Sequence, residues 1–284
     1  MQNSDLENTK FRGKYSIRVG DKLIDLSTPL VMGIVNTTPD SFYSGSRLTT
    51  NAGIISKVTK MVDEGVSIVD IGGYSSRPGA KDVSIHEEIE RVVPAIRAIA
   101  EAFPDLIISI DTFRGEVADI ALSNGAHIIN DISGFEIDPN IIRVAAKHSA
   151  PYILMHMRGT PQTMQGLTEY DNLFKDIAFY FSRKIKELQE VGVKDIILDP
   201  GFGFSKTLDQ NYELLDQLEY FHFLEKPILV GISRKSMIYK KINSTPESEE
   251  TLQKTIELNK IALKKGAHIL RVHDVKEATE IILK

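Results

Sequence analysis

The chain has 284 residues, of which 42% are hydrophobic, with 34 Lys+Arg against 39 Asp+Glu and neither cysteine nor tryptophan. This composition predicts a globular protein with a sizeable core, and it excludes a disulfide scaffold, a thiolate nucleophile and a zinc–thiolate site. The net charge of -5 provides no global basic field for nucleic acid or anionic lipid, so an anion would have to be bound by a few clustered cations.

Neither membrane insertion nor secretion is expected. The polar segment 1–10 lacks the apolar core of a signal peptide, and no later apolar run approaches the roughly 18 residues needed to span a bilayer. We therefore expect a cytoplasmic protein without a nucleic-acid or membrane partner.

The order of apolar and polar segments predicts a barrel. Residues 15–26 predict a β-hairpin around Gly20-Asp21. Eight apolar runs follow, at 30–35, 66–71, 106–110, 126–130, 151–155, 195–198, 227–232 and 267–272. Nearly continuous apolar runs are typical of parallel strands covered on both faces. Most of the runs are separated by a segment with helical periodicity, which is clearest at 173–190 and 249–265.

We accordingly predict an α/β fold, a (β/α)8 TIM barrel with an N-terminal β-hairpin. At about 35 residues per unit the chain is long enough for that fold, and no linker interrupts the series. Residues 1–14 would be an N-terminal tail and residues 15–284 a single domain. A doubly wound open sheet is the alternative.

Unusual polar residues end or follow all eight runs. They are Asn36, Asp70, Asp111, Asn130 with Asp131, His156, Asp199, Ser233 with Arg234 and Lys235, and Arg271 with His273. Because the carboxyl ends of barrel strands form one rim, we expect these side chains to converge on one mouth. A single polar residue at such a position is as often a helix N-cap or a loop anchor as a functional residue, but polar residues at the ends of all eight runs favour a functional site.

These residues divide into two chemical clusters. The first is rich in acceptors and contains Asp70, Asp111, Asn130 and Asp199. It suits a donor-rich heterocycle such as an aminopyrimidinone, although we expect Asp70 to be structural and to fasten the loop at Gly72-Gly73. The second cluster suits a polyanion such as a phosphorylated ligand, and it contains Asn36, Arg77, Lys235, Arg271 and His273.

Two loops rich in polar residues, Gly and Pro follow the first two apolar runs. They cover residues 36–45 and 72–80, and their length suits lids over the mouth. An ordinary solvated turn would account for Gly and Pro but not for Phe42 beside Asp40 or Arg77 between Ser76 and Pro78.

Together these segments resemble the dihydropteroate synthase family of the folate pathway. The resemblance covers about residues 15–284 in the right order, through 32–42 (MGIVNTTPDSF), 75–79 (SSRPG), 129–132 (INDI), 155–157 (MHM), 199–204 (DPGFGF), 231–236 (GISRKS) and 271–274 (RVHD). It implies a TIM-barrel transferase, usually a homodimer and a sulfonamide target. This enzyme joins 6-hydroxymethyl-7,8-dihydropterin diphosphate to 4-aminobenzoate with Mg2+, giving 7,8-dihydropteroate and diphosphate.

The resemblance also implies roles for individual residues. The pterin pocket would contain Asp111, Asn130, Met155, Asp199, Phe204 and Lys235. The diphosphate would meet Asn36, Arg77, Arg271 and His273, with Asn36 supplying an oxygen to Mg2+. The 4-aminobenzoate would be lined by Phe42, Ser76, Pro78, Phe204, Lys235 and Ser236. The residues implied in catalysis are Asp111, Asp199, Lys235, Arg271 and His273.

This set implies an SN1-like displacement without a protein nucleophile. Mg2+, Arg271 and His273 would neutralise the departing diphosphate, and Asp111 and Asp199 would stabilise a pterin cation. Tyr74 stands where many relatives carry Glu, which we expect to adjust binding only. The alternatives are a pterin-binding methyltransferase-type domain acting on a corrinoid and a non-catalytic pterin-binding paralogue.

Overall fold

The computed structural model describes residues 15–37, 51–74 and 82–283; the expected tail at 1–14 lies outside these ranges. Within them, ten strands form two sheets. The strands are β1 (Ser16–Val19), β2 (Lys22–Asp25), β3 (Leu30–Asn36), β4 (Ile68–Gly72), β5 (Ile107–Asp111), β6 (Ile128–Asp131), β7 (Tyr152–Met155), β8 (Ile196–Asp199), β9 (Leu229–Val230) and β10 (Ile269–Val272).

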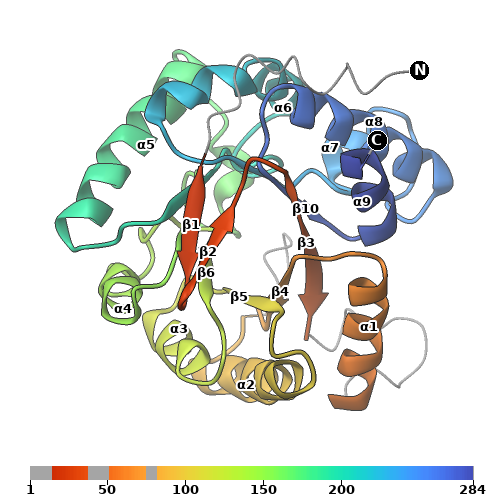
Figure 1. The fold of residues 1–284 in the computed structure, drawn as a ribbon. Helices are drawn as coiled ribbons and strands as arrows, with labels where there is room; N and C mark the ends of the chain where they lie inside the picture. The colour runs from red at the N-terminus through yellow and green to blue at the C-terminus, as the bar shows by residue number, and fades with distance from the viewer. Residues whose placement is uncertain (1–14, 38–50, 75–81, 284) are drawn as a thin grey trace.

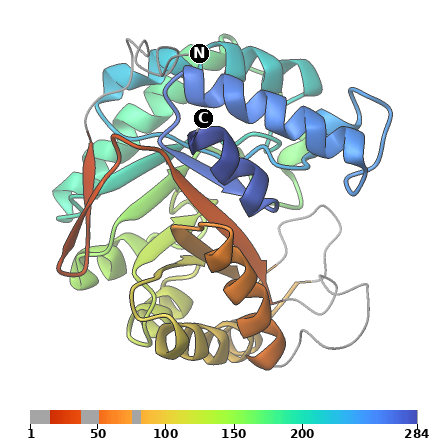
Figure 2. The same ribbon diagram turned by 45° about the vertical axis from the view of Figure 1, so that its right-hand side comes forward.

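The eight strands from β3 to β10 form a parallel barrel, as predicted. Their order in the sheet is β8-β7-β6-β5-β4-β3-β10-β9. A parallel bridge between Leu198 and Ile228 joins the two ends of this order. Helices surround the strands in Figure 1, and Figure 2 shows the same arrangement from another side. This is the TIM-barrel architecture, and the open sheet is excluded.

Nine α-helices cover the barrel in the part of the chain that the structure describes. They are α1 (Asn51–Asp63), α2 (Ile85–Ala102), α3 (Gly115–Leu122), α4 (Ile141–His148), α5 (Leu173–Glu190), α6 (Leu208–Asp216), α7 (Ser236–Tyr239), α8 (Glu249–Lys264) and α9 (Val275–Leu283). The 3-10 turns η2 (Met164–Gly166) and η3 (Leu218–Leu224) lie between them. No helix in the described ranges combines the length and apolarity needed to cross a membrane.

Side-chain caps fix where the two clearest helices begin. Asn172 accepts a hydrogen bond from the Lys175 amide at the start of α5, and Ser248 accepts from the Thr251 amide at the start of α8. Such caps satisfy amides that have no partner within the helix. Both predicted helices are confirmed, α8 ending one residue before the predicted end at Lys265.

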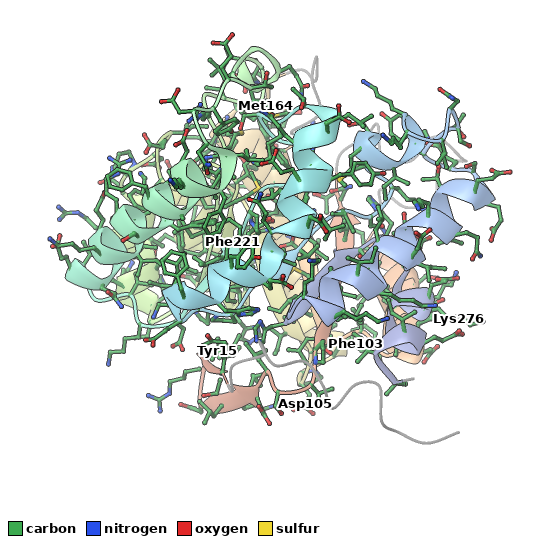
Figure 3. The ribbon with its side chains drawn as sticks, turned by 90° about the horizontal axis from the view of Figure 1, so that it is seen from above. Tyr15, Phe103, Asp105, Met164, Phe221 and Lys276 are labelled. Carbon is green, nitrogen blue, oxygen red and sulfur yellow. The ribbon has the colours of Figure 1, made fainter. Side chains whose placement is uncertain are left out.

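The hairpin β1–β2 closes the amino-terminal end of the barrel. Ile17, Val19 and Leu26 pack in one cluster with residues near the strand starts, among them Ile107 and Ile153. Figure 3 shows this end, marked by Tyr15, opposite the end that carries Met164. The bottom of the barrel is thus an apolar plug, and a polar site can form only at the other end.

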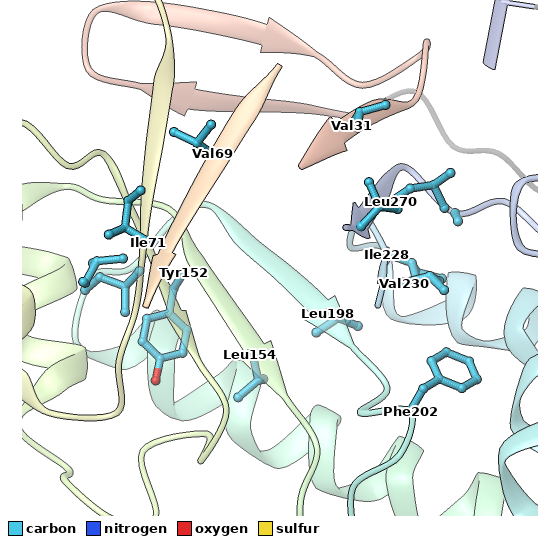
Figure 4. Close-up of a cluster of buried hydrophobic side chains, with 14 of the residues drawn as sticks. Val31, Val69, Ile71, Tyr152, Leu154, Leu198, Phe202, Ile228, Val230 and Leu270 are labelled. Atoms are coloured by element: carbon cyan, nitrogen blue, oxygen red, sulfur yellow. The ribbon is translucent and has the colours of Figure 1, made fainter. Parts of the chain in front are cut away.

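Strand alternation decides which residues face the barrel axis. In Figure 4, Val69, Ile71 and Leu154 belong to the layer between strands and helices. The intervening residues of a strand point to the opposite face. On β4 that residue is Asp70, and on β5 the series Ile107, Ser109 and Asp111 runs from the plug to the mouth. The polar strand ends therefore point inward, because they continue the alternation of the core.

Candidate active site

Six of the expected strand-end residues lie together at the carboxyl-terminal mouth, namely Asn36, Asp70, Asp111, Asn130, Asp199 and Arg271. Asp131 and His156 do not: Asp131 accepts from the Tyr152 hydroxyl, and the His156 ring packs against Tyr180 and Phe181 of α5.

Two glycines show how close the residues at the mouth are. A Cβ added at Gly72 would lie 3.6 Å from Asn36 Oδ1 and 3.6 Å from Asp111 Cβ. A Cβ at Gly231 would lie 3.7 Å from Arg271 Cβ and 4.0 Å from Asp199 Oδ2. The glycines thus lie between members of the two predicted clusters.

Arg271 links two carboxylates across the mouth. Its Nε donates to Asp70 Oδ2 and its Nη2 to Asp111 Oδ2, both at 2.7 Å. Arginine has five N–H donors in a planar fork, so the two carboxylates orient the group without exhausting it. The paired carboxylates also raise the pKa of Arg271, overcoming the opposing effect of burial. The guanidinium is therefore a fixed cation at the mouth.

Asp70 is structural, as expected, but it holds side chains of the mouth and not the loop at Gly72-Gly73. It is fully buried, and its Oδ2 accepts from both Arg271 Nε and Asn130 Nδ2, the latter at 2.9 Å. The backbone carbonyl of Gly73 is instead held by Arg91 Nη1 at 3.0 Å. Asp70 therefore fixes two side chains of the mouth, and the prediction that it fastens the loop at Gly72-Gly73 is replaced by this role.

Asp111 has an unusual proton affinity. Burial raises its pKa to about 7, with contributions from nearby Asp70, Glu88 and Asp131, while Arg271 opposes the shift. Asn130, paired with it across β5 and β6, is 3% exposed. An acceptor beside a buried amide suits a heterocycle whose N–H groups need partners.

Asp199 and Lys235 face each other across the loop after β8. Asp199 Oδ1 accepts from the Gly201 amide at 2.8 Å, and Lys235 Nζ donates to the Phe202 carbonyl at 2.6 Å. Burial raises the pKa of Asp199, and burial lowers the pKa of Lys235 to about 8 against the attraction of Asp199. The Lys235 ammonium also lies 4.6 Å from the centre of the Phe204 ring.

His273 lies next to Arg271 on the cationic side. Ser233 Oγ contacts its Nδ1 at 3.2 Å and accepts from its backbone amide at 3.2 Å. Desolvation and the charge of Arg271 lower the pKa of His273, although the residue keeps an exposed edge. Arg234 is not available in the same way, because it binds both oxygens of Asp274 at 2.7 and 2.8 Å.

An apolar wall adjoins the polar groups. Met155 clusters with Phe113, Ile132, Met157 and Met164, and Tyr74 and Phe204 pack against them. Tyr74 meets Phe113 edge-to-face at 5.0 Å, and its hydroxyl accepts from Gln162 Nε2 at 2.9 Å. Tyr74 is thus part of the wall at the base of the second predicted lid.

Several predicted ligand residues lie outside the described ranges, namely Phe42, Ser76, Arg77 and Pro78. Their roles remain predictions. Ser236 is described and begins α7 directly after Lys235.

One buried group behind the loop that follows β8 was not predicted. Lys206 is 6% exposed and contacts His156 Nδ1 at 3.1 Å. The sequence carries one signal for it, a lysine two residues after Phe204 in the segment that begins with Asp199.

Comparisons with known proteins identify the family. Residues 32–273 match the family described as pterin binding enzyme. Dihydropteroate synthase of Escherichia coli K12 is 44% identical over 259 residues, 90% of each chain. A Yersinia pestis dihydropteroate synthase structure with a sulfonamide drug has a TM-score of 0.89 at 40% identity, covering 95% of this chain and 97% of that one. One from Xanthomonas albilineans with 4-aminobenzoic acid has a TM-score of 0.86 at 31% identity, covering 95% and 97%. The chain therefore belongs to the dihydropteroate synthase family of pterin-binding enzymes.

Proposed function

We propose that the protein condenses 6-hydroxymethyl-7,8-dihydropterin diphosphate with 4-aminobenzoate, giving 7,8-dihydropteroate and diphosphate. The observation that carries this proposal is the single mouth in which Arg271 joins Asp70 and Asp111, with Asn130 and Asp199 on one side and His273 on the other. Acceptors for a pterin are thereby held next to a cation and an imidazole that suit a diphosphate.

The acceptor side would bind the pterin. Asp111, Asn130 and Asp199 offer oxygens to the ring N–H groups. Because these oxygens are buried, a ligand that leaves any of them without a hydrogen bond binds less tightly, so the pocket selects for a ligand with matching donors. Met155 and Phe204 supply apolar surface for the ring, and Lys235 lies between Phe204 and Asp199.

The cationic side would bind the diphosphate. Arg271 lies on β10 and His273 follows it, and β10 pairs with β3, the strand that ends at Asn36. The amide oxygen of Asn36 is a hard ligand of the kind that Mg2+ accepts. No group of three His, Asp or Glu that could hold a metal occurs among residues 15–37, 51–74 and 82–283. A magnesium ion here would accordingly combine Asn36 with substrate oxygens and water, and when bound it would supply positive charge to the leaving group.

The chain's own residues then favour cleavage of the carbon–oxygen bond. Arg271, as a fixed cation, stabilises negative charge that develops on the departing diphosphate, and His273 adds an N–H donor as a neutral ring, because burial and Arg271 lower its pKa to about 4. Asp111 and Asp199, when ionised, stabilise positive charge on the pterin before the arylamine attacks. Neither step requires a protein nucleophile, which makes an SN1-like displacement the proposed route.

The 4-aminobenzoate would enter beside Phe204, Lys235 and Ser236, with Phe42, Ser76 and Pro78 completing its site. Support comes from the Xanthomonas albilineans relative described with 4-aminobenzoic acid. The proposal includes a homodimer in the cytoplasm, and the absence of cysteine is compatible with a reducing compartment.

Diphosphate release by the purified protein tests the proposed reaction. It is measured with the pterin diphosphate alone and with 4-aminobenzoate, in Mg2+ and then in EDTA. We expect release only when both 4-aminobenzoate and Mg2+ are present, with dihydropteroate identified by mass. Tight pterin binding without release would indicate a non-catalytic paralogue instead, and transfer of a folate methyl group to a corrinoid would indicate the methyltransferase.

A further inference from the structure

The loop between β8 and α6 connects three groups of the mouth, and its backbone is unusual. It begins at Asp199, passes Phe204 and presents the Phe202 carbonyl to Lys235. Gly201, Gly203 and Ser205 have φ values of 74°, 82° and 45°. The Phe204 amide donates to the Gly201 carbonyl at 3.1 Å, which closes a turn at Phe202–Gly203. With three left-handed residues within five positions the loop makes no continuous helix or strand pattern, so its other polar groups need partners outside it.

Lys206 supplies two hydrogen bonds from behind the loop. Its Nζ donates to the Gly201 carbonyl and to the Phe204 carbonyl, each at 3.0 Å. Its third contact is His156 Nδ1 at 3.1 Å, which joins the loop to the residue that follows β7. Lys206 is 6% exposed, so water does not compete freely for these contacts.

The geometry holds in either protonation state of Lys206. An ammonium donates to both carbonyls and to a neutral His156 Nδ1; a neutral amine still donates twice and accepts from His156 Nδ1–H. Burial lowers the pKa of Lys206 to about 7, with Asp199 opposing the shift and Lys235 and Arg158 adding to it. Burial also holds the pKa of His156 well below its usual value.

Other contacts fix the remaining groups of the loop. The Gly203 amide donates to Asn211 Oδ1 at 2.6 Å, and Tyr170 Oη donates to the Ser205 carbonyl at 2.9 Å. Of the contacts named, those of Lys206 alone reach the carbonyls on both sides of the Phe202–Gly203 turn. Two lysines therefore act on this turn, Lys235 from the mouth and Lys206 from behind.

We propose that Lys206 is a positioning residue that holds the 201–205 loop in its pterin-binding shape, acting through the loop on Lys235, Phe204 and Asp199. It does not touch the ligand itself. The inference rests on the proposed function, because it assumes that these three residues bind the pterin. Its consequence is that the loop is ordered before the ligand arrives, so binding does not bear the cost of ordering it.

The test compares Lys206→Met with Lys184→Met, a matched buried lysine. Lys184 is on α5, is 3% exposed and binds Glu136 at 2.5 Å over the Phe135 ring, and neither partner belongs to the proposed pterin pocket. We expect Lys206→Met to weaken binding of 6-hydroxymethyl-7,8-dihydropterin at least tenfold by calorimetry and to raise the KM of its diphosphate similarly. Lys184→Met should change neither quantity more than twofold, although both variants lose thermal stability. Lys206→Gln keeps two N–H donors on a chain one atom shorter and should recover part of the affinity.

Pterin affinity within twofold of wild type in folded Lys206→Met would overturn the proposal. Should that variant not fold, hydrogen exchange of wild-type residues 201–205 gives an independent answer. We expect these amides to be protected in the free protein, with less than a twofold gain on adding the pterin; large protection that appears only with the pterin would refute preorganisation. Wild type that binds no pterin at all would instead count against the proposed function.

Discussion

Replacing Asp70 by Asn isolates the contribution of a buried charge to the mouth. Asp70 Oδ2 accepts from Arg271 and Asn130, whereas Oδ1 has no hydrogen-bond partner among the described residues. An Asn at this position can place its carbonyl where Oδ2 lies and keep both bonds. What it loses is the negative charge, and what it adds is a buried N–H2 at the place of Oδ1.

The magnitudes follow from these two changes. Hydrogen bonds to charged groups contribute about 1.5–3 kcal/mol and neutral ones about 0.5–1.5 kcal/mol. The bond from Asn130, which becomes neutral at both ends, therefore weakens by about 1–1.5 kcal/mol, while Arg271 keeps a charge-assisted bond but loses one of its two ionic partners. The unsatisfied buried donor costs about 1–3 kcal/mol more. We therefore expect the free energy of unfolding to fall by about 2–4 kcal/mol. Since about 1.4 kcal/mol corresponds to a factor of ten, kcat/KM for the pterin diphosphate should fall about tenfold.

Two measurements check this prediction. Urea unfolding followed by circular dichroism gives the stability, since the chain has no tryptophan to report it by fluorescence, and diphosphate release gives kcat/KM. Asp131→Asn is the control, because Asp131 is equally buried but accepts from the backbone amides of Ser133 and Phe135. It should lose stability and keep its KM at a pH where Asp111 is ionised in both proteins, since Asp131 also raises the pKa of Asp111. Unchanged kcat/KM in folded Asp70→Asn would refute the reasoning about Arg271.

Further predictions concern pH and backbone geometry. The profile of kcat/KM against pH should be bell-shaped. Ionised Asp111 is lost as pH falls below its pKa of about 7, and protonated Lys235 is lost as pH rises above its pKa of about 8. A flat profile from pH 5 to 10 would contradict both roles. Gly201→Ala should prevent stable folding or cost well over about 2 kcal/mol in urea unfolding, because its φ is 74° and the added Cβ would lie 2.0 Å from the His156 carbonyl oxygen. Gly192→Ala is the control, because its φ is 97° and nothing lies within 4 Å of the added Cβ, so it should lose only the backbone strain of about 1–2 kcal/mol. Equal losses of stability in the two variants would show that the structure relieves the clash between the Cβ at position 201 and the His156 carbonyl oxygen.

Much of the fold could be predicted from periodicity because strands and helices are local in sequence. Each of the eight apolar runs overlaps one barrel strand, five of the strands extending one residue past the run, and α5 has the predicted bounds Leu173–Glu190. The convergence of strand ends followed from barrel topology alone. The run at 227–232 was longer than its strand, since β9 covers only Leu229–Val230.

The partners of buried charges could not be predicted in the same way. Asp70 meets Arg271 201 positions later in the chain, and Lys206 meets His156 50 positions earlier. No local pattern encodes such a pair, because both residues satisfy ordinary local rules and the pairing is decided by which side chains the closed barrel brings together. Asp70 was therefore assigned to its neighbouring loop, and Lys206 was not assigned at all.

The central claim is that one mouth holds an acceptor pocket for the pterin next to a cationic pocket for the diphosphate. Calorimetry of Asp111→Asn and His273→Asn with 6-hydroxymethyl-7,8-dihydropterin and with inorganic diphosphate in Mg2+ tests it most directly. We predict that Asp111→Asn loses pterin binding and keeps diphosphate binding, and that His273→Asn does the reverse. Parallel losses of both ligands in both variants would contradict the division of the site.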